Sequence, residues 1–268
     1  MRTFSRLHPS NIAVRLEKSL FRSARALGLG RLMFPDHTRF MAFCHDNKAI
    51  SSSQIGQDLF VLWALGMKQD GFFVEVGAAS GVALSNTYLL ERQFGWRGIC
   101  AEPGRNWHAQ LQASRRCIVD KRCVWSQSEA ELEFMECADG EFSTLASHAT
   151  SDGHQRVEAA EGRYAVKTVS LVDLLNQHHA PQMIDYLSID TEGSELEILK
   201  AHDFNRYRFR AVTVEHNNVA DRRVALAQLF GSWGYRRALP SLSAFDDWYL
   251  LQSETDFQPD HEPAAGRH

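Results

Sequence analysis

The chain has 268 residues, of which 44% are hydrophobic and 23% are charged, and these fractions exclude a disordered, collagenous or low-complexity protein. The 29 basic and 33 acidic residues give a formal net charge of −4, which argues against a dedicated nucleic-acid-binding protein. The length fits one large α/β domain or two small ones, and no apolar run approaches the roughly 18 residues of a membrane span. The five cysteines include no CxxC pair, so we expect a cytoplasmic protein without a disulfide framework.

The segment 1–31 is basic, because it holds seven Arg or Lys and a single acidic residue, Glu17. Apolar residues recur there at helical spacing: Ile12, Leu16, Leu20 and Leu27. The segment lacks the apolar core and the cleavage site of a secretory signal peptide. We interpret it as a helix that packs on the domain with a solvated basic face. Peripheral contact with a membrane surface or an acidic partner is the alternative.

Beyond residue 52, short apolar runs bounded by glycine or turn residues alternate with helical segments. The runs predict strands at 72–76, 98–101, 117–119, 132–135, 165–169, 183–189 and 211–214. Helices are predicted at 58–65, 85–94, 106–114, 171–178, 195–202 and 222–233. This alternation indicates right-handed βαβ units and a parallel sheet. The last two runs, 235–239 and 247–251, have no helix between them and predict an antiparallel pair at one edge.

Residues 138–162 interrupt the alternation of strands and helices, since they are rich in Ser, Thr, Ala, Gly and charged residues. An irregular segment of this length in a compact domain is more often a functional lid than a simple connection. The tail from residue 252 is acidic and poor in apolar residues, and we expect it to be frayed.

A glycine-rich turn follows the first predicted strand and reads FVEVGAASG over residues 73–81. Gly77 falls where the chain turns off the strand, Gly81 allows backbone to approach a ligand, and Ser85 is a good cap for the next helix. The spacing lacks the G-x-G-x-x-G that holds a pyrophosphate, and the carboxylate of Glu75 repels phosphate. Taken alone, the motif is also compatible with an ordinary strand–turn–helix.

A second acidic residue, Glu102, ends the next predicted strand just before Pro103. A carboxylate at this strand tip, roughly 20 residues beyond the glycine turn, is placed to bind both hydroxyls of a ribose. The two features together predict an adenosine ligand with a charged tail that is not a diphosphate.

Several short motifs resemble the FkbM family of S-adenosylmethionine-dependent methyltransferases. They read SQxGQD (53–58), VEVGAxxG (74–81), SNT (85–87), GWRG (95–98), AEP (101–103) and SIDTEGSE (188–195). The resemblance covers about residues 52–251. It implies an α/β class I methyltransferase fold, a Rossmann-like three-layer sandwich whose seven-stranded sheet is mostly parallel with one antiparallel edge strand. We therefore assign 1–50 to a basic helical extension, 51–251 to an S-adenosylmethionine-binding methyltransferase domain and 252–268 to a flexible tail.

The resemblance also implies the cofactor, S-adenosylmethionine, and its contacts. Residues of the glycine turn would line its methionine end, Glu102 would hold the ribose, and Ser126 would contact the adenine. The full set of implied cofactor contacts is Glu75, Gly77, Ala78, Ser80, Gly81, Asn86, Glu102, Pro103, Ser126 and Asp190. Members of the family typically methylate hydroxyls of sugars or secondary metabolites, so the implied acceptor is a small molecule or glycan.

Acidic residues also mark the ends of two later strands. Asp190 and Glu192 follow the apolar run 183–189, and Glu215 and His216 end the next strand. Helix-start chemistry would explain Glu192, but it explains Asp190 poorly because Asp190 ends the strand. Since the carboxyl ends of parallel strands meet at one edge, we expect these four residues to converge as a catalytic group.

Methyl transfer to an alcohol requires that the hydroxyl lose its proton. His216 is the natural base by its intrinsic pKa, and Asp190 is the alternative. A third route is a divalent ion, Mg²⁺ or Ca²⁺, bound by Asp190, Glu192 and Glu215, which would acidify the hydroxyl. We favour the metal-free route from the sequence.

Two other functional classes compete with this interpretation. An NAD-linked oxidoreductase would use the same sheet but predicts the absent G-x-G-x-x-G. A non-catalytic binding module of the same fold would be expected to lack Asp190 or Glu102, and both are present. The identity of the acceptor and the oligomeric state are left open by the sequence.

Overall fold

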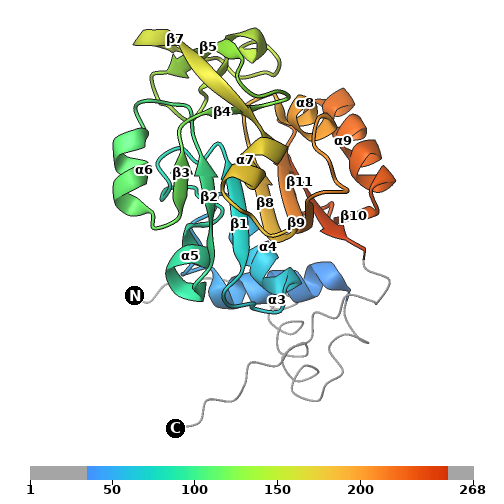
Figure 1. Cartoon of the computed structure of the whole chain (residues 1–268). Coiled ribbons are helices and arrows are strands. Elements are labelled where there is room, and N and C mark those ends of the chain that lie inside the picture. The colour runs from blue at the N-terminus through green and yellow to red at the C-terminus, as the bar shows by residue number, and fades with distance from the viewer. Residues whose placement is uncertain (1–34, 253–268) are drawn as a thin grey trace, which may run out of the picture.

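The computed structural model describes residues 35–252 (Figure 1). The basic segment 1–31 and the tail beyond residue 252 lie outside this range, so both remain predictions. Within residues 35–252, no helix is long and apolar enough to cross a membrane.

The centre of the molecule is a seven-stranded sheet with the order β10-β11-β9-β8-β1-β2-β3. Its members are β1 (Phe72–Val76), β2 (Arg97–Ala101), β3 (Ile118–Asp120), β8 (Met183–Ile189), β9 (Arg208–Glu215), β10 (Tyr235–Ala238) and β11 (Asp246–Leu251). Strands β3, β2, β1, β8 and β9 run parallel, whereas β11 is antiparallel to β9 and to β10. This arrangement confirms the predicted class I methyltransferase fold, including the antiparallel strand near one edge.

Helices cover both faces of the sheet and complete the three layers (Figure 1). One face packs against α7 (Leu171–Gln177), α8 (Glu195–Lys200) and α9 (Ala220–Ser232). The other face packs against α3 (Asp36–Asn47), α4 (Gln57–Ala64), α5 (Tyr88–Phe94) and α6 (His108–Ser114). The strands have apolar residues on both faces: Val74 and Val76 belong to the first core, while Phe73 belongs to the second.

Helix α3 lies inside the segment that was assigned to the N-terminal extension, and the sequence pattern did not predict it. Its Phe40 is buried and packs edge-on against Phe60, Trp63 and Trp248. Residues 36–47 are therefore part of the packed domain.

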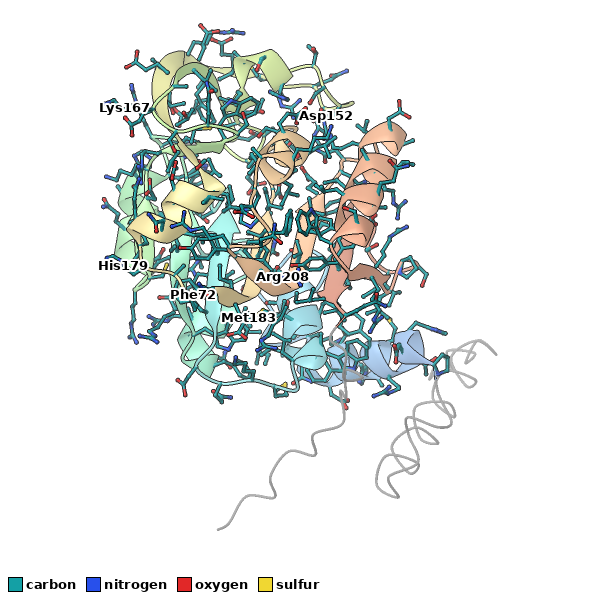
Figure 2. The ribbon with its side chains drawn as sticks, turned by 45° about the vertical axis from the view of Figure 1, so that its right-hand side comes forward. Phe72, Asp152, Lys167, His179, Met183 and Arg208 are labelled. Atoms are coloured by element: carbon teal, nitrogen blue, oxygen red, sulfur yellow. The ribbon has the colours of Figure 1, made fainter. Side chains whose placement is uncertain are left out.

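A second, smaller sheet has the order β4-β7-β5-β6 and lies beyond the carboxyl ends of the central strands (Figure 1). It comprises β4 (Cys123–Trp125), β5 (Glu131–Cys137), β6 (Thr144–Leu145) and β7 (Glu158–Ser170). The segment 138–162, predicted to be irregular, contains β6, the short helix η1 (Ala146–His148) and the start of β7. In Figure 2, the first residues of β1, β8 and β9 (Phe72, Met183 and Arg208) lie together below Asp152, which is near the top of the view.

The helix predicted from residue 85 begins later, at Tyr88. Ser85 instead forms a turn before it, because its hydroxyl accepts from the backbone N–H groups of Thr87 and Tyr88 and donates to Glu75. Residues 85–87 therefore form a fixed loop that closes over the end of β1.

Candidate active site

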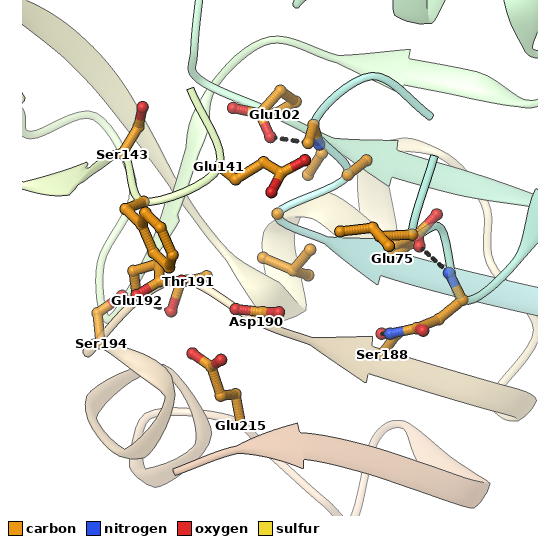
Figure 3. A pocket seen from close by; sticks show the side chains of 18 of the residues that line it. Glu75, Glu102, Glu141, Ser143, Ser188, Asp190, Thr191, Glu192, Ser194 and Glu215 are labelled. Atoms are coloured by element: carbon orange, nitrogen blue, oxygen red, sulfur yellow. Dashed lines mark hydrogen bonds between the residues drawn. The ribbon is translucent and has the colours of Figure 1, made fainter. Parts of the chain in front are cut away.

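A cavity of about 310 Å³ lies where β1, β2, β8 and β9 end, beneath the segment 138–162 (Figure 3). Its wall is drawn from the glycine turn, the tip of β2, the tips of β8 and β9, and the smaller sheet. The two acidic clusters that the sequence placed at separate strand tips thus open into one space.

Gly77 has a steric role at the centre of this wall. Its φ is +82°, and a Cβ at this position would lie 1.7 Å from the carbonyl oxygen of Asp190. Since the Asp190 N–H also donates to the carbonyl of Val76, the ends of β1 and β8 are in backbone contact. Any side chain at residue 77 would force the two halves of the cavity apart.

Ser80 and Gly81 do not line the cavity, which corrects their predicted contact with the cofactor. The Ser80 hydroxyl accepts from the N–H groups of Val82 and Ala83, and a Cβ on Gly81 would lie 2.4 Å from Leu111. Both residues shape the turn and its packing on α6.

Glu75 borders the cavity, but its carboxylate is held by the protein. It accepts hydrogen bonds from Ser85, the Asn86 N–H, Thr87 and Arg115, and only 3% of the residue is exposed. Arg115 also pairs with Glu91 behind it. Glu75 therefore fixes the loop 85–87 and acts on a ligand only through that loop.

Asn86 is the residue of this loop that faces the cavity with unused bonding capacity. Its Nδ2 donates to Ser188, whereas its Oδ1 is buried and has no hydrogen-bond partner within residues 35–252. A buried carbonyl oxygen without a donor is costly, so a ligand N–H or O–H at this point would be stabilising.

Glu102 is buried at the tip of β2, and its two oxygens accept from the N–H groups of Ala79 and Gly104, each at 2.7 Å. These two bonds leave lone pairs on both oxygens for the two hydroxyls of a ribose. Burial raises the pKa of Glu102 to about 7, although the two backbone bonds oppose the rise. Pro103 and Ala78 also line the cavity, as predicted.

The wall next to Glu102 is apolar, as an adenine ring requires. It is built from Cys123, Val124, Phe134 and Leu145. Ser126, the predicted adenine contact, lies just beyond β4 and does not line the cavity. Side chains of β4, β5 and β6 provide this wall.

Asp190 and Glu215 come together across the tips of β8 and β9, and Figure 3 shows their carboxylates facing each other. Burial raises the pKa of both groups well above the usual range. Repulsion from Glu192 raises the pKa of both further and Asp190 raises that of Glu215, whereas a hydrogen bond with Glu215 lowers that of Asp190. One oxygen each of Asp190, Glu195 and Glu215 lies within 4.8 Å of the others.

Glu192 also lines the cavity but belongs to a different group. Its Oε2 accepts from Arg156 at 2.8 Å and from Asn217 at 3.2 Å, and His154 Nδ1 lies 3.3 Å away. Asp152 shares the same arginine. The predicted trio of Asp190, Glu192 and Glu215 is therefore split, because the turn after β8 directs Glu192 toward the segment 138–162.

His216 does not reach the cavity. It is fully buried, its Nε2 lies 3.5 Å from Asp247, and its Nδ1 accepts from the Asn218 N–H. Successive residues of a strand point to opposite faces, so the strand that directs Glu215 into the cavity directs His216 away from it. This placement argues against the predicted role of His216 as the general base.

Several polar residues of the cavity were given no role by the sequence reasoning: Gln54, Gln57, Ser143, His154, Ser194, Asn217 and Asn218. The motif SQxGQD contained the signal for the first two, since its buried Asp58 binds Ser51, Ser52 and Ser53 and fixes the chain at the cavity mouth. The others depend on loop positions that no local pattern specifies.

Residues 75–259 match the family model of the FkbM methyltransferase domain. The chain belongs to the FkbM methyltransferase family. It is accordingly an S-adenosylmethionine-dependent methyltransferase, which rejects the NAD-linked alternative. No curated protein matches the chain in sequence.

Solved structures of methyltransferases are also similar to this one. FkbM methyltransferase from Methylobacillus flagellatus KT is 11% identical with a TM-score of 0.42, over 81% of this chain and 60% of that one. Precorrin-6y C5,15-methyltransferase from Geobacter metallireducens GS-15 is 13% identical with a TM-score of 0.38, over 68% and 72% of the two chains. An S-adenosylmethionine-dependent methyltransferase from Aquifex aeolicus is 9% identical with a TM-score of 0.35, over 81% and 98%.

The described residues fit S-adenosylmethionine. Glu102 offers acceptors for ribose hydroxyls, the wall of Cys123 and Val124 is apolar, and the orphaned Oδ1 of Asn86 can accept from an ammonium group. The cavity holds no basic side chain that would favour a diphosphate, since none of its lining residues within 35–252 is Lys or Arg.

Proposed function

We propose that this methyltransferase transfers the methyl group to a hydroxyl of a sugar, glycan or secondary metabolite. The observation that carries the proposal is that one cavity joins a ribose-binding carboxylate, Glu102, to the facing carboxylates of Asp190 and Glu215. The first part suits the cofactor and the second suits an acceptor that donates hydrogen bonds.

The charge of the cavity supports an acceptor that is neutral or cationic. Its acidic lining residues are Glu75, Glu102, Glu141, Asp190, Glu192 and Glu215. With no Lys or Arg among the described lining residues, a phosphorylated or carboxylated acceptor would be repelled. The hydroxyl and amide groups of Ser143, Ser194 and Asn218 suit a compound with several hydroxyls.

The chemistry follows from this geometry. S-adenosylmethionine supplies an electrophilic methyl group. The acceptor hydroxyl donates its one hydrogen bond to Asp190 or Glu215, and that carboxylate orients the oxygen and receives the proton when the methyl group is transferred. The segment 138–162 covers the site and limits access of water. Arg156 holds this cover down, because it bonds both to Asp152 of the segment and to Glu192 of the domain.

Two measurements test the proposal. Calorimetry should detect binding of S-adenosylhomocysteine to the wild-type protein, and Glu102→Ala should weaken it. Transfer of labelled methyl from S-adenosylmethionine should then be measured to methyl glycosides, to the matching amino sugars and to the matching sugar phosphates. Transfer to oxygen in the neutral or amino compounds supports the proposal. Transfer only to nitrogen, or a preference for the phosphates, contradicts it.

A further inference from the structure

The facing carboxylates at the tips of β8 and β9 have no basic partner among the residues that the structure describes. Arg156 is bound to Asp152 and Glu192, and no ion pair joins a basic side chain within residues 35–252 to Asp190 or Glu215. Glu215 is only 5% exposed, and its Oε2 has no hydrogen-bond partner within that range. This buried oxygen therefore lies next to a second carboxylate with nothing to offset its charge.

Glu195 supplies a third oxygen from the start of α8. Its Oε1 accepts from the N–H groups of Thr191 and Gly193, which holds the side chain in place. Its Oε2 accepts no hydrogen bond within the described chain and lies 3.7 Å from Arg222 Nη1, beyond hydrogen-bonding distance. The third oxygen is fixed in position and forms an ion pair with Arg222, but it accepts no hydrogen bond within residues 35–252.

Asp190 and Glu215 each have an oxygen within 4.8 Å of the other. Two ionised carboxylates this close repel each other strongly when they are buried, so a proton or a cation must lie between them. We propose that Asp190 and Glu215, with Glu195 as a third ligand, bind a divalent cation of the Mg²⁺ or Mn²⁺ type. The set differs from the one expected from the sequence, because Glu195 takes the place of Glu192.

The chemistry of the donors selects the ion. All three ligands are carboxylate oxygens, which hard cations prefer, and His216 points away from the group. A cation held by three protein oxygens keeps open positions toward the cavity. Resting on the proposed function, the inference gives the ion a role: it would lower the pKa of a coordinated acceptor hydroxyl. The proton would pass to the free oxygen of Asp190 or Glu215 as the hydroxyl oxygen takes the methyl group and S-adenosylhomocysteine leaves.

The test is direct binding of Mn²⁺ to the full-length protein, measured from the loss of the free-ion signal in electron paramagnetic resonance, with Mg²⁺ as competitor. We expect one site of submillimolar affinity, as for protein sites built from a few carboxylates. Asp190→Asn and Glu215→Gln should each weaken it by at least about tenfold. Glu197→Gln removes one charge from the exposed face of α8, outside the cavity, and should change the affinity little.

A second readout guards against variants that fail to fold. Mg²⁺ at 100 times its wild-type Kd should raise the melting temperature of the wild type by about 5–10 °C, and the same concentration should raise that of each variant by no more than about half as much. The absence of any Mn²⁺ site, or equal affinity in wild type and Glu215→Gln, overturns the inference. Binding of S-adenosylhomocysteine is measured in parallel, so that loss of the metal site and failure of the proposed function are told apart.

Discussion

The two halves of the carboxyl edge treat their acidic residues in opposite ways. At β1, Glu75 is saturated by Ser85, Thr87 and Arg115, and its charge is balanced. At β8 and β9, Asp190 and Glu215 face each other with no basic partner in the described chain. The first arrangement stabilises the fold, whereas the second is destabilising by itself. Groups held in a costly arrangement are typical of binding and catalysis, since they gain when a ligand arrives.

The largest effect on stability should come from removing Arg115, the cation that pairs with Glu75 at β1. Arg115→Ala leaves the carboxylates of Glu75 and Glu91 buried without their cation, so we expect a loss of about 3–5 kcal/mol in the free energy of unfolding. Urea denaturation measures it. Arg163→Ala, which removes an exposed arginine of a surface pair, should leave the midpoint unchanged. A small effect of Arg115→Ala would show that Glu75 does not depend on this arginine. The acids at β1 would then be no better balanced than those at β8 and β9.

A substitution at the facing carboxylates of β8 and β9 should raise the stability of the protein instead of lowering it. Asp190→Asn removes a carboxyl group whose ionised form is disfavoured by burial and by the neighbouring carboxylates. At a pH where the group ionises, the melting temperature without added metal should therefore rise by about 2–4 °C, as for roughly 1 kcal/mol in a chain of this size. The same change should reduce methyl transfer by at least about a hundredfold, because the acceptor hydroxyl loses its charged partner. A variant that loses activity together with stability would indicate a structural role for Asp190.

This contrast also marks the limit of what the sequence could reveal. The βαβ alternation and the motifs predicted the parallel sheet, its antiparallel edge pair and the positions of Glu102, Asp190 and Glu215, because each depends on local pattern and strand order. The partners of the acids depend on tertiary contacts. Arg115 approaches Glu75 from α6's end, 40 residues away, and no local signal links the two.

The errors at the site have equally specific causes. His216 was chosen by its intrinsic pKa, but strand alternation turns it from the cavity. Glu192 was grouped with Asp190 because they are close in sequence, yet the left-handed conformation of Glu192, with φ of +58°, sends its side chain toward Arg156. Glu195 resembled a helix-start residue, and only the structure shows its second oxygen near the pair.

A smaller effect is expected at Glu102, the residue proposed to bind the ribose. Glu102→Gln keeps the size of the side chain but removes its charge, so each lost charge-assisted hydrogen bond should cost about 1.5–3 kcal/mol of cofactor affinity. Calorimetry with S-adenosylhomocysteine should show roughly a tenfold to hundredfold weaker Kd. Glu197→Gln, on the exposed face of α8 outside the cavity, is the matched control and should bind the ligand normally. Equal affinity in the two variants would remove Glu102 from the cofactor site.

The smallest effect concerns pH and the same carboxyl. Burial raises the pKa of Glu102 to about 7, above the usual 4.5, so the folded protein keeps a proton that the unfolded chain has lost. The contribution of this group to stability is therefore full below about pH 4.5 and is lost as pH rises through about 7.

Cofactor binding should show the reverse trend, because ribose hydroxyls donate to the ionised carboxylate. Between pH 6 and pH 8 the ionised fraction rises roughly tenfold for a pKa near 7, and the affinity for S-adenosylhomocysteine should rise by a similar factor. Glu102→Gln cannot ionise, so its weaker binding should be independent of pH over this range. A wild-type profile as flat as that of the variant would mean that Glu102 stays ionised in the free enzyme, and its two backbone hydrogen bonds would then outweigh burial.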